Sequence, residues 1–149
     1  MNLTERINQD LKNSMKAGDK LRTETIRSIR ALILEFQKSG SGKELNQEEE
    51  IKLLTGAAKK RKDSIEQFRN AGREDLATKE EKELKILQEY LPRQFSKEEI
   101  TAEVDRIAKG LNASAKEDFP RLMPAVMKEL KGKADGKEVR ALVEDYLGK

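Results

Sequence analysis

Apolar residues recur at helical spacing along almost the whole chain, and this periodicity constrains the fold more than any other feature of the sequence. The first stripe of such residues consists of Leu3, Ile7, Leu11 and Met15. Residues spaced in this way lie on one face of a helix. Strand-type alternation never continues for more than four residues. We therefore predict an all-α protein, with an N-terminal helical hairpin or bundle followed by a small three-helix C-terminal subdomain.

The clearest break in the helical pattern lies just before residue 96. Pro92 disfavours helical backbone at the residue that precedes it, so the preceding helix is expected to end there. Ser96 and Glu99 then form a capping-box pattern, which is typical of a new helix start. We predict an N-terminal helical subdomain over residues 1–91, a linker over residues 92–96 and a C-terminal helical subdomain over residues 97–149.

Three local signals give further expectations. Asn2 and Glu5 predict a capped start for the first helix, and Asp135 and Glu138 predict the same for the last one. Gly56 lies inside a long helical stretch, where glycine costs about 1 kcal/mol relative to alanine. Either the close approach of another helix or a bend would account for it.

The composition excludes several classes of function. Charged residues make up 40% of the 149 residues, and histidine and cysteine are both absent. Without them the chain has no Ser/His/Asp triad, no cysteine nucleophile, no thiolate or imidazole metal site and no disulfide. Acidic clusters such as residues 48–50 are common in a chain with 28 acids, and acids in a first helical turn favour the helix dipole. We expect no catalytic residues, no metal site and no cofactor.

Hydropathy gives no indication of a membrane protein. The longest apolar run covers residues 31–34, whereas a spanning helix needs roughly 20 apolar residues. The N-terminal residues show neither the basic start nor the apolar stretch of a signal peptide. These observations predict a soluble cytoplasmic protein without a membrane partner.

Basic residues are concentrated in two segments. Residues 59–73 contain six basic and two acidic residues, and residues 121–140 contain six basic and three acidic residues. Such clusters suit phosphate backbones, because neutralised phosphates release their counterions. In the second segment, the turn at residues 132–137 combines glycines, lysines and the start of a helix, all of which favour phosphate binding. The alternative is a basic surface without a ligand.

The aromatic content bears on the kind of nucleic acid. The chain has only six aromatic residues, and most of them lie on apolar stripes. Recognition of single strands usually relies on exposed aromatic side chains. Structured RNA recognised by its shape therefore fits the sequence better than base recognition.

Four runs of the sequence form a recognisable set: KKRKDSIEQF at residues 59–68, AGREDLA at 71–77, YLPRQFS at 90–96 and GKADGK at 132–137. Together they resemble the GatB/YqeY family. Their order and spacing agree over nearly the whole chain, so the chain is similar to a stand-alone YqeY-like protein. The resemblance implies an all-helical fold with a larger N-terminal part and a small YqeY-like C-terminal subdomain.

The resemblance also implies a partner. Similar modules form the tail of the B subunit of glutamine-dependent aspartyl/glutamyl-tRNA amidotransferase, and a related fold precedes some glutaminyl-tRNA synthetases. There the module is taken to contact tRNA, while other domains perform the chemistry. This implies tRNA or a tRNA-charging complex as partner. It implies a carbon–nitrogen ligase assignment by association only, because the chain has no glutaminase or ATP-binding motif.

One departure from the family pattern affects the segment before the 132–137 turn. The family tends to have glycines where this chain has Pro120 and Pro124. Proline removes a backbone N–H and prevents the close approach that glycine permits. Pro120 fits a first helical turn after an Asp118 cap, whereas we predict a kink or break near Pro124.

The candidate nucleic-acid-binding residues are Lys128, Lys131, Lys133, Lys137, Arg61, Lys62, Arg69 and Arg73. Each would contact phosphate rather than read a base. Arg61 lies on the apolar stripe of its helix, so pairing with an acid in a helix interface is the alternative for it. Two other functions stay open: a protein–protein adaptor without a role in RNA binding, and an enzyme of the amide-forming class.

Overall fold

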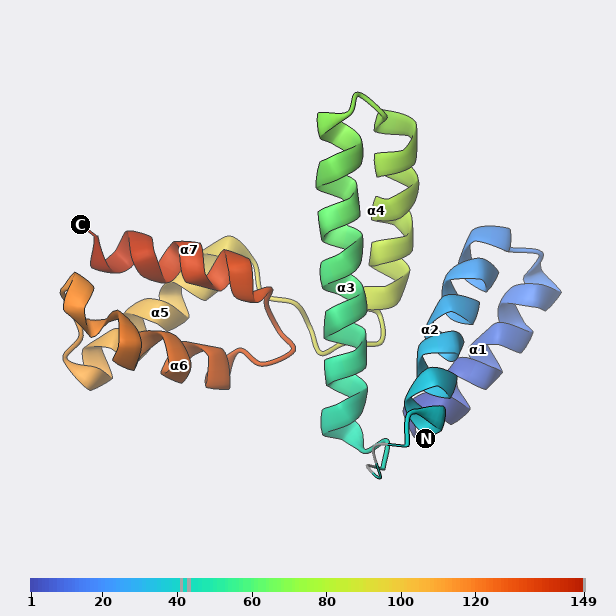
Figure 1. Cartoon of the computed structure of the whole chain (residues 1–149), viewed down its shortest axis with the longest axis horizontal. Helices are drawn as coiled ribbons and strands as arrows, with labels where there is room; N and C mark the ends of the chain where they lie inside the picture. Colours follow the sequence, from blue (N-terminus) through green and yellow to red (C-terminus); the bar gives the residue numbers. More distant parts are fainter. Residues whose placement is uncertain (41, 43, 149) are drawn as a thin grey trace. The chain divides into compact units, whose positions relative to one another are not determined.

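The computed structural model describes residues 1–40, 42 and 44–148. This part of the chain forms seven α-helices and one short 3₁₀ helix, and it contains no strand (Figure 1). The predicted all-α class is confirmed. The chain divides into two compact units, residues 1–92 (unit 1) and residues 93–149 (unit 2). None of the helices in the described residues is long and apolar enough to cross a bilayer.

The first two helices of unit 1 form a hairpin. α1 spans Leu3–Ala17 and begins with the predicted capping box, in which the Asn2 side chain accepts from the Glu5 amide at 2.9 Å. Gly18 ends α1 at φ 71°, a left-handed conformation that glycine adopts without strain. α2 spans Lys20–Lys38, and its N-cap Asp19 follows this glycine directly. The short connection therefore places α1 and α2 antiparallel to each other.

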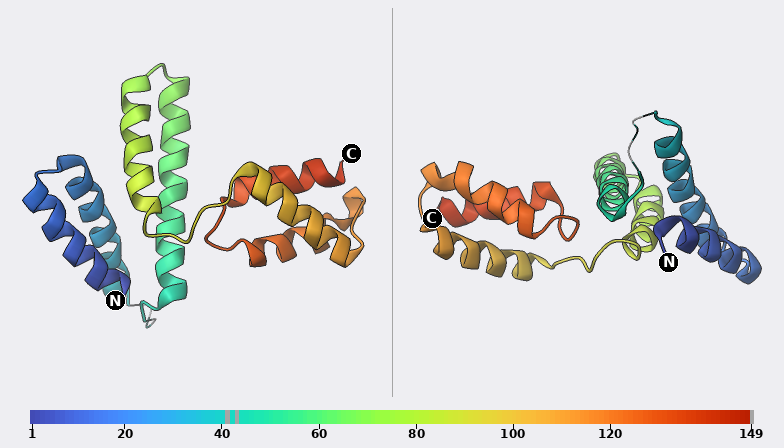
Figure 2. Two further views of the ribbon diagram at one scale, coloured as in Figure 1. Left: turned by 180° about the vertical axis from the view of Figure 1, so that it is seen from behind. Right: turned by 90° about the horizontal axis from the view of Figure 1, so that it is seen from below.

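The other two helices of unit 1 form a longer hairpin. α3 spans Gln47–Asn70 and α4 spans Glu74–Gln88. Figures 1 and 2 show α3 and α4 side by side and antiparallel, with the α1–α2 hairpin leaning away from them. The two hairpins share one apolar core. Its buried residues are Leu3, Ile7, Ile26, Ile29, Ile33, Leu54, Ala58, Leu87 and Tyr90.

The stripe predicted for α1 is correct at its start and wrong at its end. Leu3 and Ile7 are buried, but the Met15 side chain is 55% exposed, and Ser14 is buried in its place. A step of four residues overshoots a helical turn of 3.6 residues, so three such steps rotate the stripe by about 120°. Ser14 is accommodated because its hydroxyl accepts from Thr23 Oγ1 at 2.9 Å.

Unit 2 is a small bundle of three α-helices with one 3₁₀ turn. Its elements are α5 (Lys97–Leu111), η1 (Lys116–Asp118), α6 (Phe119–Glu129) and α7 (Gly136–Leu147). The predicted capping box of Ser96 and Glu99 begins α5. The fully buried side chains at the centre of this bundle are Ile100, Val104, Leu122, Leu130, Val126, Val139 and Val143. The expected three-helix arrangement of the C-terminal part is confirmed.

Pro120 lies in the first turn of α6, as predicted. Of the kink or break predicted near Pro124, the break does not occur, because α6 continues through this residue. The hydrogen bond that Pro124 cannot donate would have reached the carbonyl of Pro120, which lies in the first turn of the helix. Burial of Leu122 and Val126 on either side of Pro124 keeps this segment helical, because packing of an apolar face outweighs local propensity.

Asp118 occupies the N-cap position of α6, as predicted, but its side chain makes no capping hydrogen bond with this helix. Its Oδ2 accepts from the amides of Ser114 and Ala115 at 2.9 and 3.0 Å, and its Oδ1 accepts from Arg121 at 2.9 Å. These hydrogen bonds lower the pKa of Asp118 to about 2, with the Ala115 amide as the largest cause. Asp118 therefore stabilises the turn around η1.

Candidate functional site

The turn between α6 and α7 is held by hydrogen bonds and carries lysines. Gly132 is buried and has φ 76°, a conformation that strains any residue with a Cβ. The carbonyl oxygens of Gly132 and Lys133 accept hydrogen bonds from Gln94 Nε2 and the Phe95 amide, both at 2.8 Å. These two hydrogen bonds join the segment before α5 to the turn. They fix the backbone from which the lysine side chains extend.

The structure brings the four predicted lysines of unit 2 to the end of α6, this turn and the start of α7. Lys128, Lys131 and Lys137 are exposed, and Lys133 is half-buried with its ammonium 5.8 Å from the centre of the Phe95 ring. Lys128 belongs to the last turn of α6, and Lys137 belongs to the first turn of α7. We call these four residues the turn lysines.

The helix start beside this turn differs from the prediction. Asp135 occupies the N-cap position of α7, but its side chain makes no capping hydrogen bond. The predicted capping pair of Asp135 and Glu138 is therefore wrong. A carboxylate that is not held as a cap disfavours a second anion at the helix start. Any phosphate contact here depends on the lysine side chains rather than on the amides of α7.

Arg61 lies in the interface between helices. Its Nη1 donates to Glu80 Oε2 at 3.1 Å and is also paired with Glu83, both of which belong to α4. Its Nη2 donates to Ser28 Oγ of α2 at 3.1 Å. The Arg61 side chain is only 16% exposed. The guanidinium therefore connects three helices of unit 1.

The other two predicted arginines hold the connection between α3 and α4. Arg69 is paired with Glu74, at 3.1 Å from Nη2, and also with Glu81, and these interactions raise its pKa. Arg73 Nη2 lies 3.2 Å from an oxygen of Asp75, and the hydrogen bond to this carboxylate raises the pKa of Arg73. All of these pairs are exposed to solvent, so each contributes little to stability.

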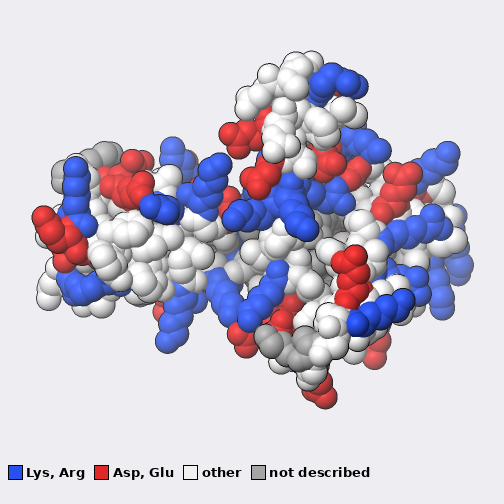
Figure 3. All heavy atoms as spheres, viewed as in Figure 1, with Lys and Arg blue, Asp and Glu red and all other residues white. Residues whose placement is uncertain are grey.

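The other three basic residues of the 59–73 segment are lysines of α3. Lys59 and Lys60 are exposed and Lys62 is half-buried, and none of them pairs with an acid in the part of the chain that the structure describes. Figure 3 shows Lys and Arg side chains over α3 and along the α1–α2 hairpin, with acidic side chains among them. Of these three lysines only Lys62 was among the predicted binding residues, although all of them belong to the same basic run.

A groove lies between α2 and α3. Its volume is about 360 Å³, and it is lined by Ser28, Leu32, Lys52, Leu53, Gly56, Ala57, Lys60 and Arg61. A Cβ added at Gly56 would meet no heavy atom within 4 Å. The predicted close approach of another helix at Gly56 does not occur in the described residues, so this glycine faces open space.

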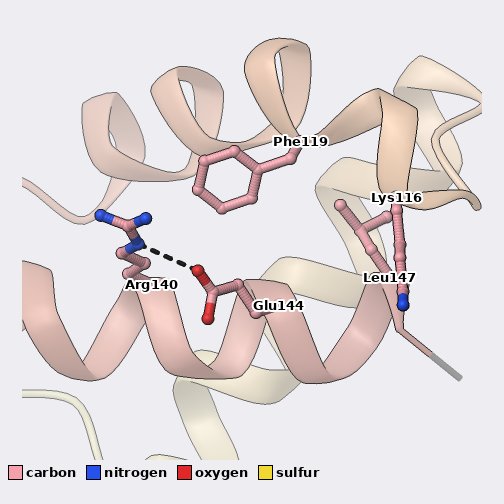
Figure 4. Close-up of a pocket in the computed structure, with 5 residues that line it drawn as sticks. All are labelled: Lys116, Phe119, Arg140, Glu144 and Leu147. Atoms are coloured by element: carbon pink, nitrogen blue, oxygen red, sulfur yellow. Dashed lines mark hydrogen bonds and ion pairs between the residues drawn. The ribbon is translucent and has the colours of Figure 1, made fainter.

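A second cavity lies between η1, α6 and α7 of unit 2 (Figure 4). Its volume is about 270 Å³, and it is lined by Lys116, Phe119, Arg140, Glu144 and Leu147. The Arg140 guanidinium lies 5.7 Å from the centre of the Phe119 ring, and its Nε donates to Glu144 Oε1 at 3.0 Å. No pattern in the sequence indicates this cavity, because it depends on how η1 and α7 pack around Phe119.

The acidic side chains form no metal centre in the described residues: no three or more of them come together as possible ligands. Most are paired with a basic side chain or cap a helix. Glu99, for example, accepts from Arg93 and from the Ser96 amide, and these hydrogen bonds lower its pKa to about 2.

Comparison with known proteins identifies the family. The family described as Yqey-like protein matches residues 4–147. The chain belongs to the YqeY-like family. The Yqey-like match thus extends over both helical units described above.

The YqeY-like chain is similar to several fungal proteins. A Pyrenophora tritici-repentis protein named altered inheritance of mitochondria protein 41, mitochondrial, is 34% identical over 96% of this chain and 80% of its own length. The protein of the same name from Kluyveromyces lactis is 37% identical over 88% of this chain and 68% of its own length. The Saccharomyces cerevisiae protein of that name is 28% identical over 87% of this chain and 69% of its own length.

The four runs that carry the family resemblance have structural roles in this member. Tyr90, in the third run, is buried, and its hydroxyl donates to Asp10 of α1 at 2.5 Å, while burial and this hydrogen bond raise its pKa. Gln94 and Phe95 of the same run bind the 132–137 turn. The first and third runs thus stabilise helix packing, whereas the fourth presents lysines to solvent.

Proposed function

We propose that this YqeY-like protein binds structured RNA of the tRNA class through the turn lysines and performs no chemistry of its own. The observation that carries the proposal is the turn of unit 2, where the carbonyl oxygens of Gly132 and Lys133 accept hydrogen bonds from Gln94 Nε2 and the Phe95 amide. These bonds fix the backbone that carries the lysines. Ammonium groups arranged in this way suit phosphates and carry no base specificity.

We propose that the lysines of α3, rather than the arginines, contact phosphate in unit 1. Arg61, Arg69 and Arg73 are engaged with carboxylates. Lys62 and its neighbours Lys59 and Lys60 are better candidates for binding phosphate, because they are not paired with acids of the described residues. The proposed surface is therefore made of lysines, which bind phosphate as mobile point charges.

The experiment is a titration of labelled tRNA into the full chain at several salt concentrations. The double variant K133E/K137E should weaken binding, and the slope of log K against log salt should fall by about 1 for each phosphate that is no longer neutralised. K12E/K16E, which changes two exposed lysines of α1, is the matched control and should bind nearly as the wild type does. Equal affinities of wild type and K133E/K137E would refute the proposal.

The family resemblance implies a tRNA-charging complex as partner, and the proposed RNA binding agrees with such a partner. A tRNA-charging assembly would gain an additional RNA-binding surface from such a protein, while other chains supply the amide-forming or ligase chemistry. The relatives reported above are named as mitochondrial proteins. For this chain, the cytoplasmic location expected from the sequence stays a prediction, and fluorescence microscopy of a tagged chain would test it.

A protein–protein adaptor is the second candidate function, and the groove between α2 and α3 favours it. The groove is lined by the apolar side chains of Leu32 and Leu53, and Gly56 leaves room for a partner to approach the backbone of α3 closely. A partner bound there should be retained after nuclease treatment and should be lost when Leu53 is replaced by glutamate. RNA binding by the turn lysines should be unaffected by the same change.

A further inference from the structure

We propose that the cavity between η1, α6 and α7 binds one unpaired nucleotide of an RNA, with the base stacked on Phe119 and a phosphate beside Lys116. The inference rests on the proposed RNA binding, but it concerns residues outside the turn lysines. The cavity volume of about 270 Å³ lies just below the roughly 300–1,000 Å³ of common ligand pockets. It therefore suits one flat ring system with its phosphate rather than a larger ligand.

The walls of the cavity provide a stacking surface. Phe119 is half-buried at the start of α6, and Figure 4 shows its ring directed toward α7, between Arg140 and Leu147. Leu147 is buried, so its position is set by the core of unit 2. A base that enters beside the ring gains stacking energy whatever its sequence, because every base has a π face.

The charges favour a nucleotide over an acidic peptide. Lys116 is exposed and has no ion-pair partner among the described residues, whereas Arg140 and Glu144 balance each other. The cavity thus has one unbalanced positive charge, which suits a single phosphate. Glu144 can accept from the exocyclic amino group of a base, which an acidic side chain does not offer.

The Arg140–Glu144 pair is free to reorganise around such a ligand. The two side chains are 66% and 54% exposed, and a pair of this kind contributes little stability in water. The Arg140 guanidinium can donate hydrogen bonds and the Glu144 carboxylate can accept them. Together they match a base edge that carries both an acceptor and an amino group. Bases with an amino group, such as cytosine, should bind better than uracil.

One of the turn lysines, Lys137, lies on α7, the helix that also contributes Arg140, Glu144 and Leu147 to the cavity. Arg140 lies three residues after Lys137, so the two side chains are neighbours on the helix surface. With a rise of 1.5 Å per residue, Glu144 lies about 10 Å further along the helix than Lys137. A strand bound to the turn lysines reaches the cavity within a few nucleotides.

The test uses the full chain and two single-stranded RNA hexamers, oligo-C and oligo-U, with affinity measured by calorimetry and the site located by amide NMR shifts. Oligo-C should bind more tightly and should shift the amides of η1 and of α7 from Arg140 onward. F119L should weaken oligo-C binding by about 5- to 150-fold, the range expected for one stacked base. K116E should weaken it as well.

Matched controls separate the site from general effects. F36L changes another half-buried phenylalanine, in α2, and K97E changes another exposed lysine, at the start of α5. Both should bind oligo-C as the wild type does. Because Phe119 packs on the core of unit 2, F119L is compared with the wild type by circular dichroism, and K116E keeps the test valid if F119L does not fold.

The outcomes distinguish this proposal from the proposed function. If F119L and K116E bind oligo-C as the wild type does, while K133E/K137E loses tRNA, the nucleotide site is refuted and the RNA-binding surface stands. If free CMP binds as tightly as oligo-C, the site belongs to a mononucleotide rather than to RNA. If a glutamate-rich peptide shifts the cavity amides and oligo-C does not, the ligand is a protein. If neither RNA nor nucleotide binds, both proposals fail.

Discussion

Arg61 of α3 donates a hydrogen bond to Glu80 of α4 at 3.1 Å. Glu83 pairs with the same guanidinium nitrogen, and Ser28 of α2 accepts from the other one. The side chains of Glu80 and Glu83 are 25% and 12% exposed, so this cluster is largely shielded from water. A basic residue in the most basic run of the chain thus connects the two hairpins of unit 1.

Replacing Arg61 by methionine should lower the free energy of unfolding by about 2 kcal/mol, the range for hydrogen bonds to charged groups, because two neighbouring carboxylates lose their common partner. Urea denaturation measures the change. The folded variant should retain its affinity for tRNA. R69M is the matched control, and since its ion pairs are exposed, it should affect stability less. If R61M folds but binds tRNA much more weakly than the wild type, Arg61 belongs to the RNA-binding surface.

Gly56→Ala should stabilise unit 1 by about 1 kcal/mol, the difference in helix propensity between the two residues. The added Cβ meets no heavy atom within 4 Å, so no clash opposes this gain. Thermal melting measures the effect. G72A is the contrasting change, because Gly72 has φ 74° and alanine is strained there. A loss of stability in G56A would show that the glycine is needed within the chain itself.

Gly132→Ala should destabilise unit 2 by about 1–2 kcal/mol, because a residue with a Cβ is strained at φ 76°. The strain should also loosen the hydrogen bond of the Phe95 amide to the Lys133 carbonyl. Hydrogen exchange of the Phe95 amide should therefore become faster. G136A is the control, since Gly136 lies in α7 and its Cβ would only touch the end of the Met127 side chain at 3.5 Å. Unchanged exchange in G132A would mean that the turn tolerates alanine.

The starts and ends of several helices could be predicted from the sequence, because they depend on residues close to them in the chain. The caps at Asn2 and Ser96 and the left-handed stop at Gly18 depend on residues within four positions, and all of them are present. The assignment of Met15 to the core failed because a fixed spacing of four drifts around the helix, and only the tertiary structure shows where the core ends.

The candidate site was less predictable, since it depends on which distant groups meet. Nothing near Arg61 in sequence indicates that Glu80 and Glu83 approach it from α4. Asp135 had the correct position for a cap, but side-chain geometry decides whether a cap forms, and here none does. The environment of Phe119 likewise arises only through the packing of α7, which places Arg140 beside its ring.

Acid should destabilise unit 2 through Asp118. The amides of Ala115 and Ser114 and the Arg121 guanidinium lower the pKa of this carboxyl from 3.8 to about 2 in the folded state. The unfolded chain therefore binds more protons than the folded one between these values, and the free energy of unfolding falls as pH decreases through this range. The contribution is fully present at neutral pH, because both states are then ionised.

The variant D118N should melt at a lower temperature than the wild type at pH 7, and this difference should shrink as pH falls from about 5 to about 2. The measurement is a series of thermal melts over that range. D145N changes an exposed aspartate of α7 and is the control, whose melting temperature should follow that of the wild type at every pH. Glu99, held by Arg93 and the Ser96 amide, should give the same behaviour in E99Q, because its pKa is lowered from 4.5 to about 2. A gap between wild type and D118N that stays constant down to pH 2 would show that the carboxylate's charge is not what stabilises the η1 turn.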